Sequence, residues 1–320
     1  MLIGVVGKTN VGKTTFFSAA TLVDAEISNR VFTTINPNQG VAYVRAKCPC
    51  KSLGVKCNPQ NSKCVDGTRY IPVKLVDIAG LVPGAHRGKG MGNQFLSDIM
   101  EADALIHVVD LSGGTDSEGN PTDPGTHNPA VDIEFLPREI DYWILGILKK
   151  NWSSIKTKAR TGNEKLEELI YHQLSGLGIS PTHVKKACER HNPLEDDSEE
   201  NLLSFIENLR RAAKPIIVAG NKMDIPEAEK NFRELSDTDI KVIPCSAEAE
   251  LALRKAEAEG DIVYNPGDPD FTIIKEDLEE RKKQALEFIR ERILKKFGST
   301  GVQQVLDAAT FDLLNMIVVY

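Results

Sequence analysis

Short apolar runs alternate along the chain with segments whose apolar residues recur every three or four positions. The runs predict buried strands over residues 2–6, 41–44, 70–76, 104–109, 215–219 and 240–244. The helical spacing predicts helices over residues 15–22, 93–102 and 276–297. Strands that alternate with helices are typical of a mostly parallel sheet with helices on its faces, so the pattern predicts the α/β class.

The middle of the chain has a different pattern. From residue 138 to 213 only helical spacing is found, as in Ile140, Trp143 and Ile144. These segments contain no residue pattern that indicates chemistry. We interpret them as a helical insertion that divides an α/β domain of residues 1–137 and 214–310.

The first predicted strand leads into a glycine loop, Gly7-Lys-Thr-Asn-Val-Gly-Lys-Thr14, which fits the pattern G-x-x-x-x-G-K-[ST]. Glycine torsions let successive N–H groups turn toward a polyphosphate at the positive end of the next helix. We expect Lys13 to reach the β and γ phosphates and Thr14 to offer its hydroxyl to Mg²⁺. The pattern alone also occurs by chance in proteins that bind no nucleotide. The predicted contacts in this segment are Gly7, Asn10, Val11, Gly12, Lys13, Thr14 and Thr15.

A second motif, Asp77-Ile-Ala-Gly80, follows the predicted strand over residues 70–76. A carboxylate at the end of a buried strand can hold Mg²⁺ through water, and the N–H of Gly80 can reach a γ phosphate. The glycine-dense run up to Gly92 predicts a mobile loop. The turn-rich stretch 32–40 predicts another loop beside the phosphates, in which Thr34 is a candidate Mg²⁺ ligand.

A third motif, Asn221-Lys-Met-Asp224, follows the strand predicted over residues 215–219. A carboxylate at Asp224 can accept hydrogen bonds from both N1–H and the exocyclic amine of guanine, which adenine cannot offer. We expect Asn221 and Lys222 to brace the loop and cover the ring. Beyond the next strand, backbone N–H groups at Ser246 and Ala247 can meet the guanine carbonyl oxygen.

Composition narrows the class of protein. The 320 residues carry a net charge of −7, which argues against binding nucleic acid through the overall field of the protein. No apolar run approaches the roughly 20 residues of a membrane span, so we expect a cytoplasmic protein without a membrane partner. Six cysteines in a chain of this length do not suggest a disulfide scaffold.

Taken in order, the glycine loop, the Thr34 loop, D-x-x-G, N-K-x-D and Ser246-Ala247 resemble the five nucleotide motifs of the GTPase superfamily. Two stretches are most similar in sequence to the YchF branch of the Obg group. They are residues 32–40, Phe-Thr-Thr-Ile-Asn-Pro-Asn-Gln-Gly, and residues 77–92. The resemblance covers residues 1 to about 310 and implies a Ras-like P-loop NTPase fold.

Two features depart from the YchF pattern. YchF proteins typically have an N-x-x-E type motif and favour ATP, whereas Asn221-Lys-Met-Asp224 restores the residues for guanine. The family also ends in a small β-rich TGS domain. Residues 311–320 are long enough only for its opening strand, so this domain is either absent or cut short in this chain.

The resemblance implies Mg²⁺-dependent hydrolysis of GTP to GDP, with Lys13, Thr34 and Gly80 around the γ phosphate and Asp77 holding Mg²⁺ through water. Loss of that phosphate would release the two loops together, as in a molecular switch. One alternative is an ATPase like the closer YchF relatives. Another is a nucleotide-gated protein that binds RNA or ribosomes with negligible turnover. The sequence leaves the partner, the rate and the oligomeric state open.

The residue after Gly80 is Leu81, which cannot orient the attacking water. GTPases with this substitution often carry an Asn at the position of Asn10, where it helps to coordinate a K⁺ that replaces an arginine finger. Asn10 is equally consistent with a turn preference alone. His86 is another candidate for positioning water, although a lone His in a glycine-rich loop is more often solvated.

Four cysteines, Cys48, Cys50, Cys57 and Cys64, lie in an excursion at residues 45–69 between two predicted strands. They can surround one tetrahedral Zn²⁺, form two disulfides, or remain reduced in a flexible loop. Six Lys or Arg residues and one acidic residue give the excursion a net charge of +5. This charge predicts either a solvated lysine-rich loop or a small RNA-binding surface.

Overall fold

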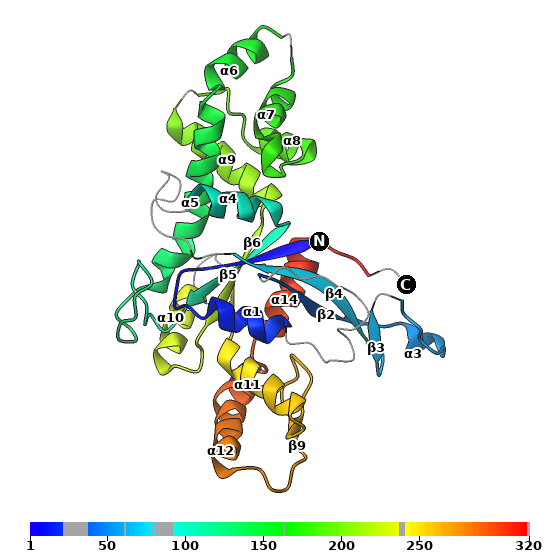
Figure 1. Cartoon of the computed structure of the whole chain (residues 1–320). Coiled ribbons are helices and arrows are strands. Elements are labelled where there is room, and N and C mark those ends of the chain that lie inside the picture. Colours follow the sequence, from blue (N-terminus) through cyan, green and yellow to red (C-terminus); the bar gives the residue numbers. More distant parts are fainter. Residues whose placement is uncertain are drawn as a thin grey trace.

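A seven-stranded sheet in the order β2-β4-β1-β5-β6-β7, with β3 paired to β4, forms the centre of the molecule (Figure 1). The structure is a computed structural model that describes residues 1–21, 38–60, 62–78, 80, 92–162, 164–196, 198–236 and 241–318. The strands are β1 (Leu2–Val6), β2 (Gln39–Lys47), β3 (Lys63–Val65), β4 (Thr68–Asp77), β5 (Ala104–Asp110), β6 (Ile216–Asn221) and β7 (Val242–Pro244). Only β2 and β3 run antiparallel to their neighbour β4 within this sheet, so the predicted mostly parallel sheet is confirmed.

Helices cover both faces of the sheet. On one face, α1 (Lys13–Thr21) and α14 (Val302–Asp307) enclose a core with Val5, Leu75 and Ile106. On the other face, α4 (Gly92–Glu101), α5 (Pro129–Lys149) and α9 (Glu199–Ala213) pack over Leu105 and Val6. Strands buried on both faces are apolar at successive positions, which explains the continuous runs in the sequence.

The helical part extends from one edge of this body (Figure 1). Between α5 and α9 it contains α6 (Trp152–Arg160), α7 (Leu166–Leu174), η2 (Ser175–Leu177) and α8 (Pro181–Arg190). The side chain of Asn128 caps α5 by accepting a 3.0 Å hydrogen bond from the N–H of Ala130. The helix thus begins before residue 138, the predicted start of the insertion, and continues through Pro137. The domain boundaries themselves stay a prediction.

A second small body lies at the opposite end of the molecule from α6 (Figure 1). It contains α11 (Ala247–Ala258), β8 (Ile262–Val263), β9 (Thr272–Ile273), α12 (Glu280–Ile289), the π-helix η3 (Arg290–Leu294) and α13 (Lys295–Phe297). Leu253, Phe271 and Leu286 belong to its own hydrophobic cluster. The sequence indicated only one helix here, and Gly298, the C-cap of α13, has a positive φ of 78°. The remaining long helix, α10 (Pro226–Ser236), lies between β6 and β7 in the chain.

The end of the chain follows α14 as a second π-helix, η4 (Ala308–Leu313), whose first residues are buried against the sheet. Residues 315–318 have no regular secondary structure. Residues 311–313 end this helix, and the assignment of residues 311–320 to the start of a truncated TGS domain stays a prediction.

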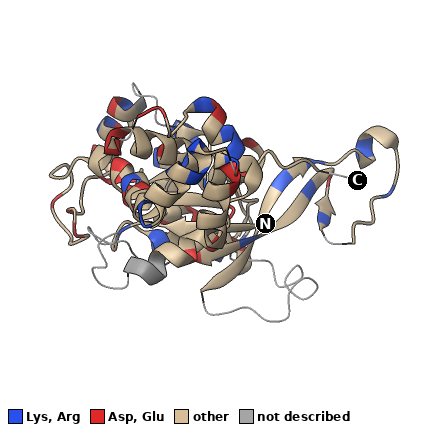
Figure 2. Cartoon of the chain, turned by 90° about the horizontal axis from the view of Figure 1, so that it is seen from above, with Lys and Arg blue, Asp and Glu red and all other residues tan. Residues whose placement is uncertain are grey.

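The cysteine excursion contains more regular structure than its composition indicates. β2 continues to Lys47, a short helix α3 (Cys50–Leu53) follows, and β3 pairs with the start of β4. Figure 2 shows this segment projecting from the body of the molecule, with positions of Lys and Arg coloured along its ribbon. The predicted loop is in fact a strand extension, a helical turn and a hairpin.

Candidate nucleotide-binding site

The glycine loop connects the carboxyl end of β1 to the first turn of α1, which begins at Lys13. Gly12 has a φ of +89°, and a Cβ at this position would lie 2.3 Å from Nδ2 of Asn221. Only glycine therefore fits at this position. The free N–H groups at the start of α1 and the positive end of its dipole favour an anion here.

Lys13 and Asp77 form a direct ion pair, with 12% and 18% of their side chains exposed. Asp77 ends β4, which pairs with β1 in the register Val5↔Asp77, so the sheet places it beside the glycine loop. A Cβ on Gly80 would lie 3.5 Å from the backbone nitrogen of Thr9. The structure thus brings together the residues predicted to contact the phosphates and to hold Mg²⁺.

The other residues predicted to lie near the phosphates are either on the first turn of α1 or outside the described part of the chain. The side chain of Thr14 is exposed in the first turn of α1, where it is accessible to a ligand, and Thr15 is half-buried. Thr34, Leu81 and His86 lie outside the described residues. The predicted roles of these three residues stay predictions.

Asn221 connects three of the predicted motifs. Its Nδ2 donates a 2.9 Å hydrogen bond to the carbonyl oxygen of Val11 in the glycine loop. Its Oδ1 accepts a 2.9 Å hydrogen bond from the N–H of Ala247. Because the side chain is 3% exposed, these bonds are shielded from water. The phosphate-side and base-side segments are therefore fixed relative to each other by one amide group.

Asp224 lies on the base side of the site. Its Oδ1 accepts a 2.7 Å hydrogen bond from Oγ of Ser246. A carboxylate has about four acceptor positions, so this bond leaves others for the two donors of guanine. The N–H of Ser246 donates to the carbonyl oxygen of Thr300 at 2.8 Å, and the Thr300 hydroxyl donates to the buried Glu250. The Ser246-Ala247 turn is thus supported by the segment that precedes α14.

Lys222 forms an ion pair with Asp110, a residue that the sequence analysis missed. The Nζ–Oδ2 distance is 2.8 Å, and the Asp110 side chain is fully buried. Asp110 also accepts hydrogen bonds from the backbone and hydroxyl of Ser112 and from the hydroxyl of Thr115. Lys222 has a positive φ of 67°. The buried acid thus holds the strained turn after β6, and its sequence signal was a carboxylate directly after the apolar run of β5.

The segment between β5 and α5 also contacts the glycine loop. Oδ2 of Asp132 lies 2.7 Å from Nζ of Lys8, and the carbonyl oxygen of Asp116 accepts a 2.6 Å hydrogen bond from the same amine. The Lys8 side chain is 4% exposed. Ser112 and Thr115 are buried within the segment between β5 and α5. Lys8 was treated as an unspecified loop residue, and the structure shows that it joins the loop to the start of α5.

Asn10 has a φ of +62° and donates from Nδ2 to the carbonyl oxygen of Gly119 at 2.9 Å. A Cβ on Gly119 would lie 2.1 Å from Oγ1 of Thr9, so the contact requires glycine. The positive φ agrees with a turn preference for Asn10, and the hydrogen bond fixes the orientation of its amide. Both explanations of this residue stay open.

His107 in the centre of β5 is fully buried. Burial, with a smaller contribution from the nearby charge of Lys8, lowers the pKa of its imidazole to about 3. His107 is therefore neutral at physiological pH.

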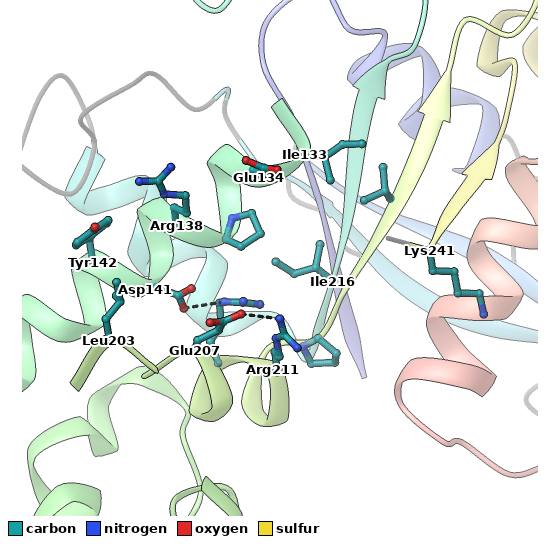
Figure 3. A pocket seen from close by; sticks show the side chains of 14 residues that line it. Ile133, Glu134, Arg138, Asp141, Tyr142, Leu203, Glu207, Arg211, Ile216 and Lys241 are labelled. Carbon is teal, nitrogen blue, oxygen red and sulfur yellow. Dashed lines mark hydrogen bonds and ion pairs between the residues drawn. The ribbon is translucent and has the colours of Figure 1, made fainter. Parts of the chain in front are cut away.

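A separate pocket of ≈ 550 Å³ lies beside α5, α9 and the edge of the sheet (Figure 3). It contains the buried ion pair between Arg210 and Asp141, whose Nε–Oδ1 distance is 2.7 Å, and the exposed pair of Arg211 and Glu207. Burial raises the pKa of the Asp141 carboxyl to about 6, although Arg210 acts in the opposite direction. Among the residues that the structure describes, none of those predicted to bind nucleotide lines this pocket.

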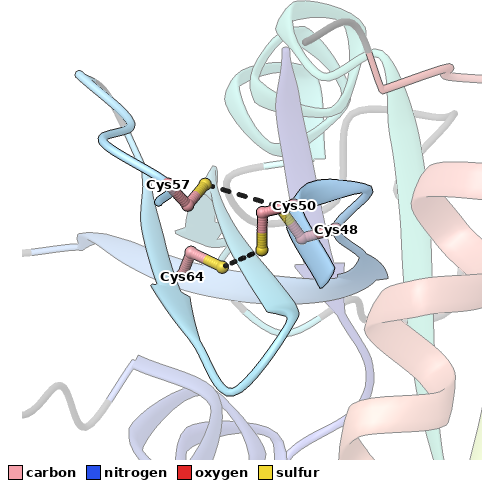
Figure 4. Close-up of side chains that lie close together, drawn as sticks. All are labelled: Cys48, Cys50, Cys57 and Cys64. Carbon is pink, nitrogen blue, oxygen red and sulfur yellow. Dashed lines mark hydrogen bonds between the residues drawn. The ribbon is translucent and has the colours of Figure 1, made fainter. Parts of the chain in front are cut away.

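The four clustered cysteines converge at the base of the projecting segment (Figure 4). The distance between their sulfur atoms is 3.5 Å for Cys48 and Cys57 and 3.7 Å for Cys50 and Cys64. Burial by itself would raise the pKa of the Cys48 thiol, but hydrogen bonds, the largest from Arg69, lower it to about 6. All six cysteines are free thiols in the structure. Of the three alternatives for this cluster, the structure does not form the disulfides, and zinc ligation and the reduced loop both stay predictions.

Two protein-family profiles match the chain. One, described as a 50S ribosome-binding GTPase, matches residues 2–134. The other, described as the G4 motif-containing domain of the Obg-like GTPase YGR210-like group, matches residues 219–320. The matches include the glycine loop, D-x-x-G and N-K-x-D. No described helix combines the length and apolar character needed to cross a membrane.

The chain is similar over its whole length to two GTP-binding proteins. The protein of Methanocaldococcus jannaschii is 50% identical over 100% of this chain and 81% of its own length. The protein of Schizosaccharomyces pombe is 35% identical over 100% of this chain and 81% of its own length. The ribosome-binding ATPase YchF of Mycoplasma genitalium is 34% identical over 68% of this chain and 55% of its own length.

Two solved structures of GTP-binding proteins are similar to this chain. A GTP binding protein from Pyrococcus horikoshii has a TM-score of 0.75 and 42% identity over 99% of this chain and 80% of its own. The YchF GTPase of Schizosaccharomyces pombe, with a TM-score of 0.53 and 22% identity, covers 98% of this chain and 76% of its own and supports the fold alone. The predicted P-loop GTPase fold is confirmed.

Proposed function

The chain belongs to the Obg/YchF-type GTPases, and on that premise we propose that it hydrolyses GTP to GDP and phosphate in a Mg²⁺-dependent reaction. The observation that carries this proposal is the bridge made by Asn221. It joins the glycine loop to the Ser246-Ala247 turn, so the phosphate contacts and the base contacts belong to one rigid site.

The ion pair between Lys13 and Asp77 supports the assignment of their roles. A bound ligand can replace each partner of this ion pair. Lys13 can pair with a negatively charged phosphate in place of Asp77, and Asp77 can hold the positively charged Mg²⁺ through water in place of Lys13. Bound Mg²⁺ supplies positive charge to the β and γ phosphates, and Thr14 and Thr34 are the hydroxyls proposed to hold it. Lys13 and the N–H groups of the glycine loop then offset the charge that develops as water attacks the γ phosphate.

Gly80 lies against the glycine loop, where its N–H can donate a hydrogen bond to the γ phosphate. We therefore assign Gly80 and Thr34 to the switch that responds to loss of this phosphate.

Leu81 cannot position water, so Asn10 with K⁺ and His86 remain the candidates for assisting the attack. If Asn10 coordinates K⁺, hydrolysis is faster in potassium than in sodium buffer, and Asn10→Ala removes the difference. Equal rates in both buffers exclude Asn10 from this role.

The guanine assignment depends on Asp224. Replacing Asp224 by Asn removes an acceptor for N1–H, and a buried mismatch of this kind costs about 1–3 kcal/mol, or roughly 5- to 150-fold in affinity. Asp224→Asn should lose GTP affinity by this amount and prefer xanthosine triphosphate. Asp277→Asn, which changes an exposed carboxylate far along the chain, is the matched control.

Competition binding of GTP, ATP and xanthosine triphosphate tests the base preference, and single-turnover hydrolysis tests the enzyme. Equal affinity of the wild type for GTP and ATP would contradict the guanine assignment and favour an ATPase, the activity named for the YchF relatives. Tight GTP binding with no hydrolysis would instead favour a nucleotide-gated binding protein.

A link to the ribosome or RNA is the second part of the proposal. It is supported by the name of the YchF relatives, ribosome-binding ATPase, and by the basic projecting segment of this chain. Co-sedimentation with ribosomes in the presence of a non-hydrolysable GTP analogue or of GDP tests it. We expect the bound fraction to depend on the nucleotide, and no binding in either state would contradict the link.

A further inference from the structure

Three separate elements bring the four cysteines of the projecting segment together. Cys48 follows the end of β2, Cys50 opens α3, and Cys64 lies in β3, while Cys57 comes from the connection between the last two. Their four sulfur atoms all lie within 4.8 Å of one another. Cysteines separated by up to 16 positions in the sequence therefore share one small space.

The spacing of the sulfurs fits a single tetrahedral centre. With Zn–S distances of about 2.3 Å, a tetrahedron places neighbouring sulfurs roughly 3.8 Å apart. Two of the separations are 3.5 Å, between Cys48 and Cys57, and 3.7 Å, between Cys50 and Cys64. We propose that Cys48, Cys50, Cys57 and Cys64 bind one structural Zn²⁺ as four thiolate ligands (Figure 4).

The surroundings of the sulfurs are those of a thiolate site. Nη2 of Arg69 donates to the sulfur of Cys57 at 2.9 Å and to that of Cys48 at 3.3 Å. Four thiolates around one Zn²⁺ carry a net charge of −2, which the Arg69 guanidinium and the lysines of the segment offset.

Apart from the pairing of its strands, the segment has no hydrophobic core among its described residues. Among its described residues, none from 49 to 69 belongs to a hydrophobic core cluster, and Leu53, Val55 and Val65 are 69%, 57% and 39% exposed. A small element without a core commonly derives its folding energy from a bound metal. The site is separate from the nucleotide site, so this proposal does not depend on the proposed hydrolysis.

Metal analysis of the full chain, purified without chelator and desalted, tests the proposal directly. We expect one zinc per chain in the wild type and none in Cys64→Ser. Cys188→Ser, which removes a half-buried thiol from α8, should keep one zinc and is the matched control. Absence of zinc from the wild type, whether its thiols are free or paired as disulfides, overturns the proposal, as does full zinc content in Cys64→Ser.

Cobalt substitution gives a second readout that does not require the variant to fold. After removal of zinc from the wild type, added Co²⁺ should give the visible absorption of a tetrahedral tetrathiolate site, and added Zn²⁺ should displace it. Limited proteolysis should cut residues 49–66 in the stripped chain and spare them after zinc is restored. A cobalt spectrum without thiolate character, or cleavage that is the same with and without zinc, contradicts the four-cysteine site.

Discussion

The nucleotide site and the cysteine-containing projecting segment lie at opposite ends of the paired strands β2 and β4. At one end, β4 finishes at Asp77 beside the glycine loop, and at the other end it begins beside the cysteines. The nucleotide end is built from buried strands and hydrogen bonds between distant segments. The cysteine end has four sulfur atoms in place of a hydrophobic core.

The two regions therefore differ in the interactions that keep them folded. The nucleotide site is shaped by the packing of the protein itself, since Asn221 and Asp110 are buried and bonded before any ligand enters. The cysteine segment buries little apolar surface to offset the entropy of folding, so the proposed Zn²⁺ would supply its order. Changes at one end should therefore leave the other unaffected, and the following predictions test that separation.

The largest effect is expected from Lys13→Ala. The lysine is proposed to stabilise charge on the transferred phosphate, and loss of one such donor commonly lowers kcat by roughly 10²- to 10³-fold. Single-turnover GTP hydrolysis measures this loss, while the zinc content should remain one per chain. Lys51→Ala in α3 removes an equal charge from the cysteine end and should leave hydrolysis unchanged. A wild-type rate in Lys13→Ala would refute the role of the lysine.

The nucleotide site was largely predictable because its motifs specify local geometry. A glycine loop between a strand and a helix, and Asp77 and Asp224 near strand ends, can be recognised from neighbouring residues alone. The mostly parallel sheet was predictable for the same reason, since buried strands are continuous apolar runs.

The contacts that hold these motifs together were not predictable. The pairs Lys222–Asp110 and Lys8–Asp132 join residues that are 112 and 124 positions apart, and no local pattern specifies such partners. The convergence of the cysteines was only one of three alternatives from the sequence, because their spacing matches no standard zinc motif. The small body around Leu253 and Phe271 was missed because its strands have only two residues each.

Asn221→Ala tests whether the nucleotide end is held by the fold. The change leaves the carbonyl of Val11 and the N–H of Ala247 without their partner. Each buried unpaired group costs about 1–3 kcal/mol, so for the two groups we expect the free energy of unfolding to fall by roughly 2–6 kcal/mol. Urea unfolding of nucleotide-free protein measures it, because bound nucleotide would mask the loss.

The matched control is Asn151→Ala, whose side chain makes an exposed hydrogen bond to Gln173. We expect this change to alter stability by no more than about 0.5 kcal/mol. An Asn221→Ala protein as stable as the control would show that the bridge contributes no net stability. Removal of zinc should not change the difference between the two variants, because the cysteine segment is not part of the bridge.

His107→Leu has the smallest expected effect, and it concerns pH. The buried imidazole has its pKa lowered to about 3, whereas the unfolded chain has a His pKa of about 6.5. Between these values the unfolded state binds a proton that the folded state does not, so stability is complete above about pH 6.5 and is lost as the pH falls.

From about pH 7.5 to about pH 5, this single group should lower the free energy of unfolding by roughly 2 kcal/mol, at about 1.4 kcal/mol per pH unit below 6.5. Comparison of urea unfolding at the two pH values in wild type and in His107→Leu isolates the contribution, since all other titrating groups are shared. His172→Leu, which removes an exposed ring from α7, is the control. If His107→Leu keeps the full pH dependence of the wild type, the centre of β5 is accessible to protons, and the sheet beneath the nucleotide site is less closed than its packing indicates.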